Sequence, residues 1–279
     1  MTAGVLYVVA TPIGNLGDIS ARALRTLAEV DAIAAEDTRH TLQLLQHFDL
    51  RKTLIALHEH NEAEQAELLV HRLLAGEQLA LVSDAGTPLI SDPGFRLVSA
   101  AHAAGVPVRT VPGASAAMAA LSVSGQSCDR FVFEGFLPAR SAARRGRLAE
   151  LFAEQRSLIF YEAPHRLQET LADLLGVMGD RSITLCRELT KAYETVLRMP
   201  LSELCERVRH DADQCRGEIV LVLAGCASQS GGDVQEHRRV LDILLQELPP
   251  SQAAALAARL TGGRRKWFYE EALAREPKD

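Results

Sequence analysis

The chain has little of several features that would point to a particular class of protein. Aromatic residues make up 5% of its 279 residues, so a binding surface built from rows of stacking rings is not indicated. Lysine and arginine number 30 against 36 aspartates and glutamates, and the formal net charge of −6 argues against a generally basic surface for nucleic acid. A local basic patch stays compatible with this total, because binding depends on where the charges lie.

Five cysteines are present, but their spacing does not indicate a site. Their number is odd and no pair has the Cys-x-x-Cys spacing, which argues against a disulfide framework and against a zinc site. This usage favours a reducing compartment, and the N-terminus lacks a signal-peptide pattern, so we expect a cytoplasmic protein. Residues 111–128 carry no charge but are mostly small, which predicts a packed internal helix rather than a membrane span.

Short apolar runs alternate with helical patterns through the first half of the chain. The strands are expected at residues 6–10, 32–35, 54–57, 79–82 and 106–111. Asn61, followed three residues later by Glu64, predicts a capping box at one helix start, and Asp92 with Pro93 predicts another start. Strands separated by helices in this way predict a mostly parallel sheet covered on both faces.

The rest of the chain has a different residue pattern and ends in a helical tail. A second α/β half is expected, with strands at residues 131–136, 158–161, 183–187, 195–198 and 219–223. Residues 227–234 are rich in Ser and Gly, as in a linker, and helical pieces are expected at 236–247, 251–260 and 265–274. We therefore predict an N-terminal α/β domain at residues 1–126, a C-terminal α/β domain at 127–226, and a linker with a helical extension at 227–279.

Two of the predicted strands end in loops that suit a small molecule. Asp-Ala-Gly-Thr-Pro follows the strand near residue 82, and Pro-Gly-Ala-Ser follows the strand that ends at 111. Ligands of open α/β sheets lie past the carboxyl ends of the strands, where glycine lets the backbone approach them. No Gly-x-Gly-x-x-Gly follows the first strand, which disfavours a Rossmann dinucleotide enzyme. The loops predict a site built largely from main-chain groups; two ordinary strand-to-helix turns are the alternative.

Nine motifs, taken in order, carry a resemblance to one family. They are TPIGNLGD, AEDTR, HEHNE, VSDAGTPLISDPG, PGAS, FEGFLP, YEAPHR, CRELTK and GEIVLVL. This set resembles the ribosomal RNA small-subunit methyltransferase I group, within the tetrapyrrole-methylase-like (class III) methyltransferases. The resemblance spans residues 5 to 225, and the helical tail is similar to the C-terminal extension of that group.

The resemblance implies both a fold and a reaction. It implies two α/β domains with S-adenosylmethionine (AdoMet) in the cleft between them, normally in a homodimer. The implied reaction is methyl transfer to the ribose 2′-hydroxyl of a cytidine in the decoding region of 16S rRNA, in the small ribosomal subunit, without a metal or a membrane. Relatives that act on corrins or sirohaem have a glycine-richer first loop ending in GDP. Here that loop reads Pro-Ile-Gly-Asn at residues 12–15, which counts against a porphyrin substrate.

Two alternatives to this function stay open. One is an AdoMet-dependent methyltransferase that acts on a tetrapyrrole or on a protein side chain, although HEHNE, CRELTK and the tail argue against it. The other is an RNA-binding module without catalysis. Calorimetry with AdoMet, NAD and ATP would separate the cofactor classes.

The resemblance also assigns residues to the methyl donor. Those expected to contact AdoMet are Pro12, Ile13, Asp84, Thr87, Ser115, Ala116, Tyr161 and Ala224. Asp84 has the alternative role of an Asx-turn residue, and Ser115 that of a helix N-cap, which is compatible with binding a ligand.

A ribose hydroxyl is a poor nucleophile at neutral pH, so a positioned base is expected. Strand-end candidates are Glu36, Asp37, His58, Glu188 and Lys191. We favour Glu36, Asp37 or Lys191, the last as a desolvated amine with a lowered pKa; an ordinary ion pair between Glu188 and Lys191 is the alternative. The chain near His58 offers no matching third ligand cluster, so no metal is expected.

RNA contact requires local positive charge. The residues predicted to bind RNA are Arg39, Arg140, Arg144, Arg145 and Arg166. Three of them belong to a segment, 140–147, that contains no acidic residue, which favours phosphate binding; a solvated helix face is the alternative. A second basic patch, Arg-Arg-Lys-Trp at residues 264–267, lies in the tail.

Overall fold

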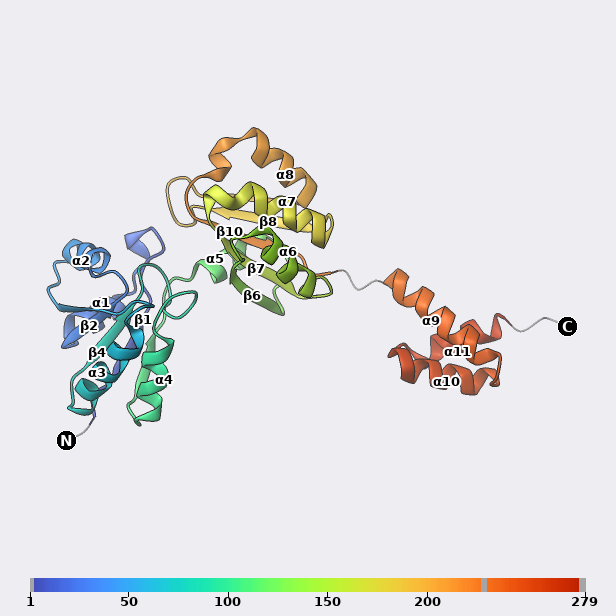
Figure 1. Cartoon of the computed structure of the whole chain (residues 1–279), viewed down its shortest axis with the longest axis horizontal. Helices are drawn as coiled ribbons and strands as arrows, with labels where there is room; N and C mark the ends of the chain where they lie inside the picture. Colours follow the sequence, from blue (N-terminus) through green and yellow to red (C-terminus); the bar gives the residue numbers. More distant parts are fainter. Residues whose placement is uncertain (1–2, 227–229, 276–279) are drawn as a thin grey trace. The chain divides into compact units, whose positions relative to one another are not determined.

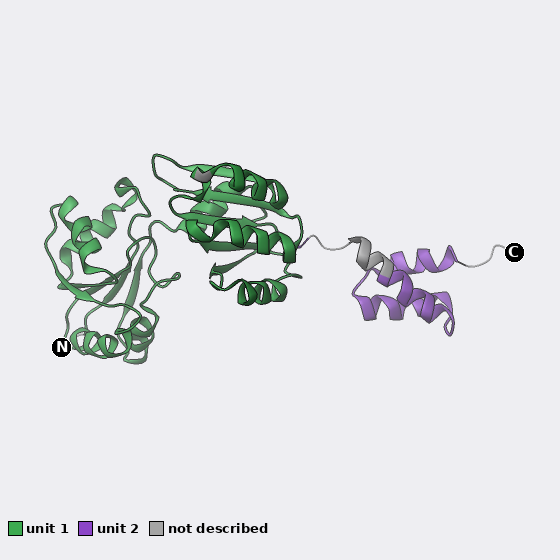
Figure 2. Ribbon diagram, turned by 45° about the horizontal axis from the view of Figure 1, so that its top comes forward, with its two compact units in different colours: residues 1–225 green, residues 226–279 purple. Residues whose placement is uncertain are grey.

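The computed structural model describes residues 3–226 and 230–275. The chain forms two compact units, residues 1–225 and residues 226–279, which Figure 2 shows in separate colours. We call them unit 1 and unit 2, and each is described by itself.

Unit 1 begins with a five-stranded parallel sheet in the order β3-β2-β4-β1-β5. Figure 1 labels three of its strands, β1, β2 and β4. The strands are β1 (Leu6–Val9), β2 (Ala32–Ala35), β3 (Thr53–Ala56), β4 (Leu79–Val82) and β5 (Val108–Val111). The helices are α1 (Ala21–Glu29), α2 (Thr38–His47), α3 (Glu62–Leu74) and α4 (Phe95–Ala103), with a 3₁₀ turn, η1 (Leu16–Asp18). The expected mostly parallel sheet is confirmed.

Burial on both faces explains why these strands read as continuous apolar runs. Successive side chains of a strand point to opposite faces. In β4, Leu79 and Leu81 pack in the core beneath α3 and α4, whereas Ala80 and Val82 pack in the core beneath α1 and α2. All four β4 residues are buried, as in a parallel sheet covered by helices on both sides.

A second sheet follows, in the order β6-β7-β10-β8-β9. Its strands are β6 (Phe131–Phe136), β7 (Ser157–Glu162), β8 (Ser182–Arg187), β9 (Thr195–Pro200) and β10 (Ile219–Leu223). The associated helices are α5 (Ala116–Ser124), α6 (Ser141–Glu150), α7 (Leu167–Met178) and α8 (Leu201–His210), with the turns η2 (Pro164–Arg166) and η3 (Ala212–Cys215). The strands β6 and β7 are parallel, and the other pairs are antiparallel.

Helix α5 joins the two sheets within unit 1. Its residues Ala117, Ala120 and Leu121 pack with β7, β8 and β10, and Ile13 of the first loop belongs to the same cluster. The expected internal helix within residues 111–128 is thus present. It packs on the second sheet, although its residues belong to the predicted N-terminal domain.

Two helix starts differ from the expected ones. Asn61 makes no side-chain bond to the N-terminus of α3; its Oδ1 accepts from the His58 backbone N–H at 2.8 Å, and its amide donates to the Ala56 carbonyl oxygen at 3.0 Å. Helix α4 begins at Phe95, after the predicted start at Asp92. The carboxylate of Glu62 caps it, accepting from the backbone N–H groups of Gly94 at 3.0 Å and Arg96 at 2.7 Å. A residue 32 positions away thus replaces the local cap.

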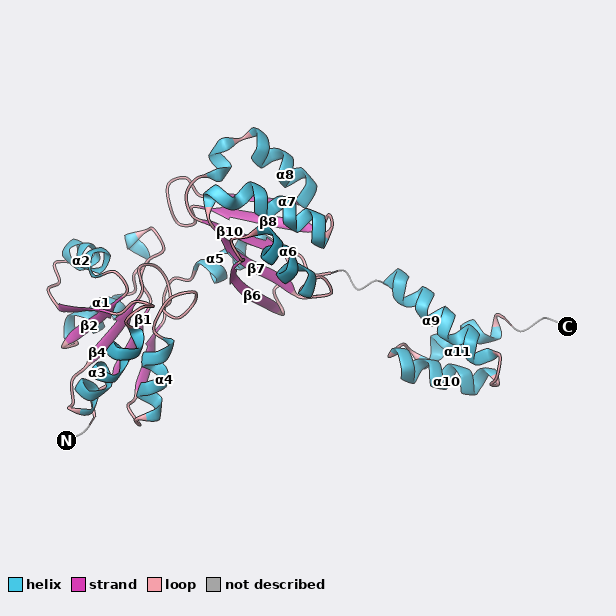
Figure 3. Ribbon diagram, in the orientation of Figure 1, coloured by secondary structure: helices cyan, strands magenta, loops and turns pink. Residues whose placement is uncertain are grey.

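The described part of unit 2 is helical (Figure 3). Its helices are α9 (Ser230–Leu245), α10 (Pro250–Thr261) and α11 (Arg265–Leu273). Leu241, Ala257 and Phe268 are among the residues of its small core. Of the expected linker, residues 227–229 lie outside the described residues, and residues 230–234 belong to α9. Among the described residues, no helix has both the length and the apolarity to cross a bilayer.

Candidate active site

A cavity of about 390 Å³ lies in unit 1, bordered by loops of both sheets. Six of the eight residues predicted to bind the donor line it, namely Ile13, Asp84, Thr87, Ser115, Ala116 and Tyr161. Pro12 lines a smaller cavity of about 250 Å³, together with Gly14, His40, Gln43 and Asp84. Asp84 lines both, so the two cavities adjoin.

Ala224 lines neither of these two cavities. It follows the carboxyl end of β10, whereas Ile219 and Val220 at the opposite end of that strand line the larger cavity. A strand rises about 3.3 Å per residue, so roughly 13 Å of strand separate Ala224 from the cavity end. The structure therefore does not bring Ala224 to the predicted donor site.

Three loops of the first sheet interlock through their main chains. Thr11 and Gly86 exchange two backbone hydrogen bonds, at 2.9 and 3.1 Å, and the Thr87 hydroxyl donates to the Ala114 carbonyl oxygen at 3.0 Å. Gly86 has φ +79°, and a Cβ there would lie 3.2 Å from Ile13 Cγ2. Only glycine takes this conformation without strain. The loops after β1, β4 and β5 thus form one rigid wall of the cavity.

The opposite wall is aromatic and comes from the second sheet. The ring of Tyr161 packs edge-on against Phe133 and Phe136, with centroids 5.0 and 5.6 Å away. Burial raises the pKa of Tyr161. Ile219 and Leu189 extend this apolar surface along the cavity. The second wall is therefore aromatic and apolar.

The charged side chains that line the cavity are acidic, and two of them, Glu162 and Glu218, pair with Arg166 and Lys191 just outside the lining. Its lining contains the carboxylates Glu36, Asp84, Asp92, Glu162 and Glu218. Among the described residues that line it there is no lysine or arginine. A partly enclosed site with this charge attracts cations.

Two of these carboxyls have raised pKa values. Burial raises the pKa of Glu36; the nearby charges of Asp84 and Asp37 add to the effect, and a hydrogen bond from the Asp84 backbone N–H to Glu36 Oε2, at 3.3 Å, opposes it. Burial raises the pKa of Asp92 to about 6, with the charges of Glu36 and Asp84 adding and a hydrogen bond from Ser83 opposing. Sequence reasoning missed Asp92, because it treated this residue as a helix start.

The carboxylate of Asp37, unlike that of Glu36, is bound by an arginine. Both of its carboxylate oxygens bind Arg39, at 2.6 and 3.1 Å, and these hydrogen bonds hold the pKa of Asp37 far below its usual value. Its backbone N–H donates to Asp84 Oδ1 at 3.0 Å. Asp37 is therefore a weak base that helps to position Asp84, and the exposed Arg39 side chain is partly neutralised by it.

The predicted low pKa of Lys191 is wrong. Burial alone would lower the pKa of its amine, but Glu188 at 2.9 Å and Glu218 at 3.2 Å outweigh burial and raise it. The ion-pair alternative therefore holds for Lys191. Its side chain lies against Gly14, where a Cβ would be 2.2 Å from Lys191 Cε, so it links the first loop to the loop after β8.

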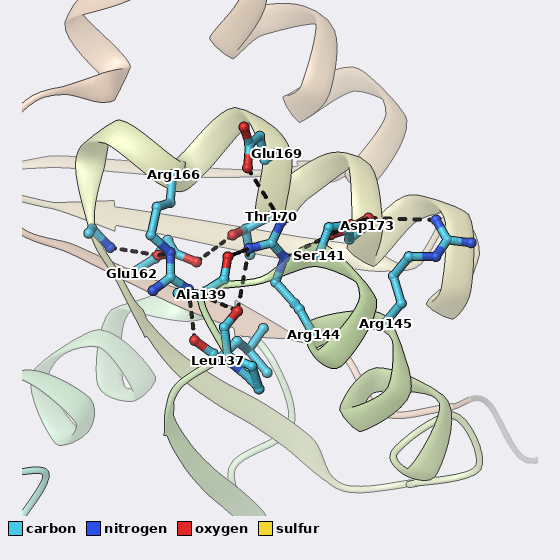
Figure 4. A network of polar contacts seen from close by, with 12 residues as sticks. Leu137, Ala139, Ser141, Arg144, Arg145, Glu162, Arg166, Glu169, Thr170 and Asp173 are labelled. Carbon is cyan, nitrogen blue, oxygen red and sulfur yellow. Dashed lines mark hydrogen bonds and ion pairs between the residues drawn. The ribbon is translucent and has the colours of Figure 1, made fainter.

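Two of the predicted RNA-binding arginines are structural (Figure 4). The side chain of Arg144 is 0% exposed; its Nε donates to Asp173 Oδ2 at 2.8 Å and its Nη1 to the Ala139 carbonyl oxygen at 3.2 Å. Arg166 donates to the Leu137 carbonyl oxygen at 2.7 Å, and its Nε lies 3.2 Å from Glu162. Both guanidinium groups hold the loop at 137–139 against α7, so they are not presented to an RNA phosphate.

The other arginines of this segment face solvent. Arg140 and Arg145 are exposed, and Arg147 binds Glu134 at 2.8 Å and Glu150 at 2.6 Å.

His58 lies near His60, with ring centroids 6.1 Å apart. Among residues 3–226 and 230–275, no cluster of three or more His, Cys, Asp or Glu side chains could hold a metal ion.

Comparisons with known proteins identify the family. Residues 5–205 match the family described as Tetrapyrrole (Corrin/Porphyrin) Methylases, and residues 231–276 match the RsmI C-terminal HTH domain. The chain belongs to the tetrapyrrole methylase family. The resemblance stated from the motifs is confirmed, and with it the prediction of a methyltransferase.

Relatives of high identity share the whole length of the chain. The Ribosomal RNA small subunit methyltransferase I of Pseudomonas aeruginosa is 55% identical over 281 residues, which cover 100% of both chains. The protein of that name from Xylella fastidiosa (strain Temecula1) is 56% identical over 269 residues, 96% of this chain and 98% of its own. The one from Escherichia coli O157:H7 is 49% identical over 274 residues, 98% and 96%.

Solved structures of lower identity share the fold. The methyltransferase CobJ aligns with a TM-score of 0.59 at 18% identity, over 81% of this chain and 95% of its own. The uroporphyrin-III C-methyltransferase of Thermus thermophilus, complexed with S-adenyl homocysteine, aligns with a TM-score of 0.55 at 20% identity, over 79% and 97%. The predicted tetrapyrrole methylase fold is thereby confirmed.

Proposed function

We propose that the chain transfers a methyl group from AdoMet to the ribose 2′-hydroxyl of a cytidine in the decoding region of 16S rRNA. The observation that carries the proposal is the acidic cavity between interlocked main-chain loops and an aromatic wall, in a chain 55% identical to a ribosomal RNA small subunit methyltransferase I. The small ribosomal subunit is then the partner, and the cytoplasm is the place of action. A homodimer is part of the same proposal.

The chemistry of the cavity fits AdoMet. The donor carries positive charges on its sulfonium and its ammonium group, and a lining with carboxylates and without lysine or arginine suits both. Its adenine has a flat apolar face, which suits the wall around Tyr161. Without a Cβ, Gly86 packs closely against Ile13 and the Ala114 carbonyl, which keeps the cavity wall compact. When bound, AdoMet supplies the methyl group.

We assign the donor to the residues that line the larger cavity. Asp84 faces the cationic part, Thr87 orients its loop through the bond to Ala114, and Ser115 and Ala116 present the start of α5. The Ser115 hydroxyl makes no capping bond to its own helix, which leaves it available to a ligand. Ile13 and Tyr161 contribute apolar contacts from opposite sides.

The three predicted catalytic residues take different parts in this proposal. Glu36 lines the cavity, and of the two carboxyls it is the one with a raised pKa. Asp37 positions Asp84, and Lys191 holds the first loop through Gly14. Holding two reactants in line is worth several kcal/mol of the barrier, up to about 7–11 in the best models, so positioning residues matter here.

RNA binding is assigned to the exposed cations. Arg140 and Arg145 remain from the predicted set in α6 and its approach, with Arg39 near the cavity. Arg264, Arg265 and Lys266 are exposed in unit 2. Phosphate contacts by such residues weaken steeply with salt.

Tritiated methyl transfer onto purified 30S particles that lack the modification tests the proposal. We expect incorporation that depends on AdoMet, and mapping should place the methyl group on one ribose. A tetrapyrrole assayed in parallel should take up no label. AdoMet binding without any transfer to 30S particles, to 16S rRNA or to assembling particles would contradict the proposed substrate.

A further inference from the structure

The loop between β4 and α4, residues 83–94, holds a carboxylate that the assignments above do not use. Asp92 lies near the end of this loop and lines the larger cavity. Two of its neighbours, Leu89 and Ser91, have φ values of +74° and +68°, which are strained for residues with side chains. Such strain persists only where the surroundings hold the backbone in place.

The surroundings of the loop do hold it. At its start, the Thr87 hydroxyl bonds the Ala114 carbonyl oxygen. At its end, Glu62 binds the backbone of Gly94, and a Cβ at Gly94 would lie 2.7 Å from Leu81 Cδ2. Asp92 is therefore held between two anchored points.

The middle of the loop meets the second sheet. Strand β6 has a bulge between Phe133 and Gly135, and Gly135 has φ +63°. A Cβ at Gly135 would lie 2.8 Å from Ser91 Oγ, so the bulge and the glycine make room for the residue next to Asp92. Contacts from both sheets thus hold the backbone beside Asp92 in place.

Three groups act on the charge of Asp92 besides burial. Glu36, after β2, and Asp84, after β4, disfavour its ionised form. The Ser83 hydroxyl donates a hydrogen bond that favours it. Tyr161 of β7 lines the same cavity, and the charge of Asp92 adds to the effect of burial in raising the pKa of its phenol. No lysine or arginine is among the described residues that line this cavity, so Asp92 keeps the basicity that burial provides.

We propose that Asp92 accepts the proton of the ribose 2′-hydroxyl during methyl transfer. This inference rests on the function proposed above. The ribose O–H bond breaks, its proton passes to a carboxylate oxygen of Asp92, and the electron pair left on O2′ forms the bond to the methyl carbon while the C–S pair stays on sulfur. Protonated Asp92 then releases the proton to water.

The other candidates suit this role less well. Asp37 is bound by Arg39 and is a weak base, and Lys191 is protonated beside Glu188 and Glu218. Glu36 Oε2 already accepts the Asp84 backbone N–H. A pKa of about 6 makes Asp92 largely ionised at neutral pH and yet a better base than an ordinary carboxylate.

The variant Asp92→Asn tests the proposal on the full-length protein with 30S particles. At saturating AdoMet we expect kcat to fall by about 10²–10⁴-fold, the range for loss of a general base, while the AdoMet Kd from calorimetry stays within about threefold. Asp213→Asn, which changes an exposed carboxylate paired with Arg216, is the matched control and should leave both values unchanged.

The pH dependence supplies a readout that a structural role would not move. In the wild type, kcat/KM should fall below a pKa near 6, because Asp92 must be ionised to accept a proton. Ser83→Ala removes the hydrogen bond that favours the charged form, so this limb should move to higher pH. In protein labelled with ¹³C at aspartate carboxyls, without donor or RNA, one carboxyl should titrate near 6, shift upward in Ser83→Ala and disappear in Asp92→Asn.

Several outcomes would overturn the inference. Asp92→Asn with kcat within threefold of the wild type, or with its acid limb intact, rules out Asp92 as the proton acceptor. Weaker AdoMet binding with kcat restored at saturation makes Asp92 a donor ligand instead. If Asp92→Asn does not fold, an unshifted limb in Ser83→Ala rejects the proposal. Failure of the wild type to methylate 30S particles counts against the proposed function, not against Asp92 alone.

Discussion

Two groups of charged side chains in unit 1 are built in opposite ways. Around the larger cavity, Glu36, Asp84 and Asp92 gather without a lysine or arginine among the described lining residues. Between α6 and α7, Arg144 and Asp173 are buried as a pair, with Ser141 donating to the same carboxylate at 2.9 Å (Figure 4). The first group raises carboxyl pKa values, and the second neutralises its own charge.

The difference distinguishes charged groups that suit a ligand from charged groups that stabilise the fold. Burying a charge is costly unless a partner compensates it, so an uncompensated group persists where a ligand supplies the opposite charge. The Arg144 side chain has its charge partner, Asp173, within the protein, and with Arg166 it holds the 137–139 loop beside the cavity. In the function we propose, the cationic AdoMet supplies the charge opposite to the carboxylates around Asp84.

The test with the largest expected effect removes one partner of the buried Arg144–Asp173 pair. Arg144→Met removes the guanidinium and leaves the Asp173 carboxylate, whose side chain is 10% exposed, without its main partner. We expect the free energy of unfolding to drop by about 3–5 kcal/mol in urea denaturation. Arg145→Met, which removes an exposed side chain 3.5 Å from the same carboxylate, should cost less than about 1 kcal/mol. Equal losses in the two variants would mean that burial does not determine how much each arginine contributes to stability.

The next test removes one negative charge from the carboxylates that line the cavity. Asp84→Asn keeps an acceptor for the Asp37 backbone N–H but removes a negative charge from the cavity. Calorimetry should show AdoMet binding weaker by about 10–100-fold, the value of a hydrogen bond or contact to a charged group. S-adenosylhomocysteine, which lacks the sulfonium charge, should lose less affinity. A similar loss for both ligands would argue against attraction of the sulfonium.

A third test asks whether the ionised Asp92 carboxylate lowers the free energy of unfolding at neutral pH. The pKa of Asp92 is raised from 3.8 to about 6, so the folded state binds its proton more tightly than the unfolded state does. The stability associated with that proton is present at low pH and is lost as pH rises from about 4 to 6. Asp92→Asn should therefore be more stable than the wild type at pH 7.5, by about 1–2 kcal/mol after allowance for solvent screening of this partly exposed carboxyl.

Thermal unfolding at several pH values checks this. The advantage of the variant should shrink toward pH 4 and vanish below about pH 3, where the wild-type carboxyl is protonated in the unfolded as well as in the folded state. An advantage that is the same at pH 4 and pH 7.5 would come from something other than the charge.

The smallest expected effect concerns the exposed cations of unit 2. Replacing both Arg264 and Arg265 by Ala should weaken RNA binding by about 3–10-fold and reduce the slope of log Kd against log salt by up to about 2. Filter binding at several salt concentrations measures both, with AdoMet affinity as the control. An unchanged salt slope would show that these arginines do not contact phosphate.

The fold was largely predictable because it depends on local patterns. The strand at 79–82 was expected at the residues where β4 lies, and the loops after it were recognised from their Gly, Pro and Asp content. Five of the eight expected donor residues line one cavity from loops of the first sheet, since in parallel sheets the carboxyl ends of the strands share an edge, and Tyr161 joins them from the second sheet.

The roles of the charged residues were much less predictable. The arginines in 140–147 look alike in the sequence, yet Arg144 is buried on Asp173, 29 positions away, while Arg145 is half exposed. Asp92 read as a local helix start, but Glu62 caps α4 in its place and Glu36 and Asp84 act on its charge.

The sequence by itself thus determined the order of strands and helices, the position of the ligand loops and the family. The tertiary structure decided which ionisable groups are neutralised, which are exposed and which keep an uncompensated charge in the cavity. The physical reason is that backbone preferences act over a few residues, whereas burial and electrostatic interactions depend on neighbours that only folding brings together.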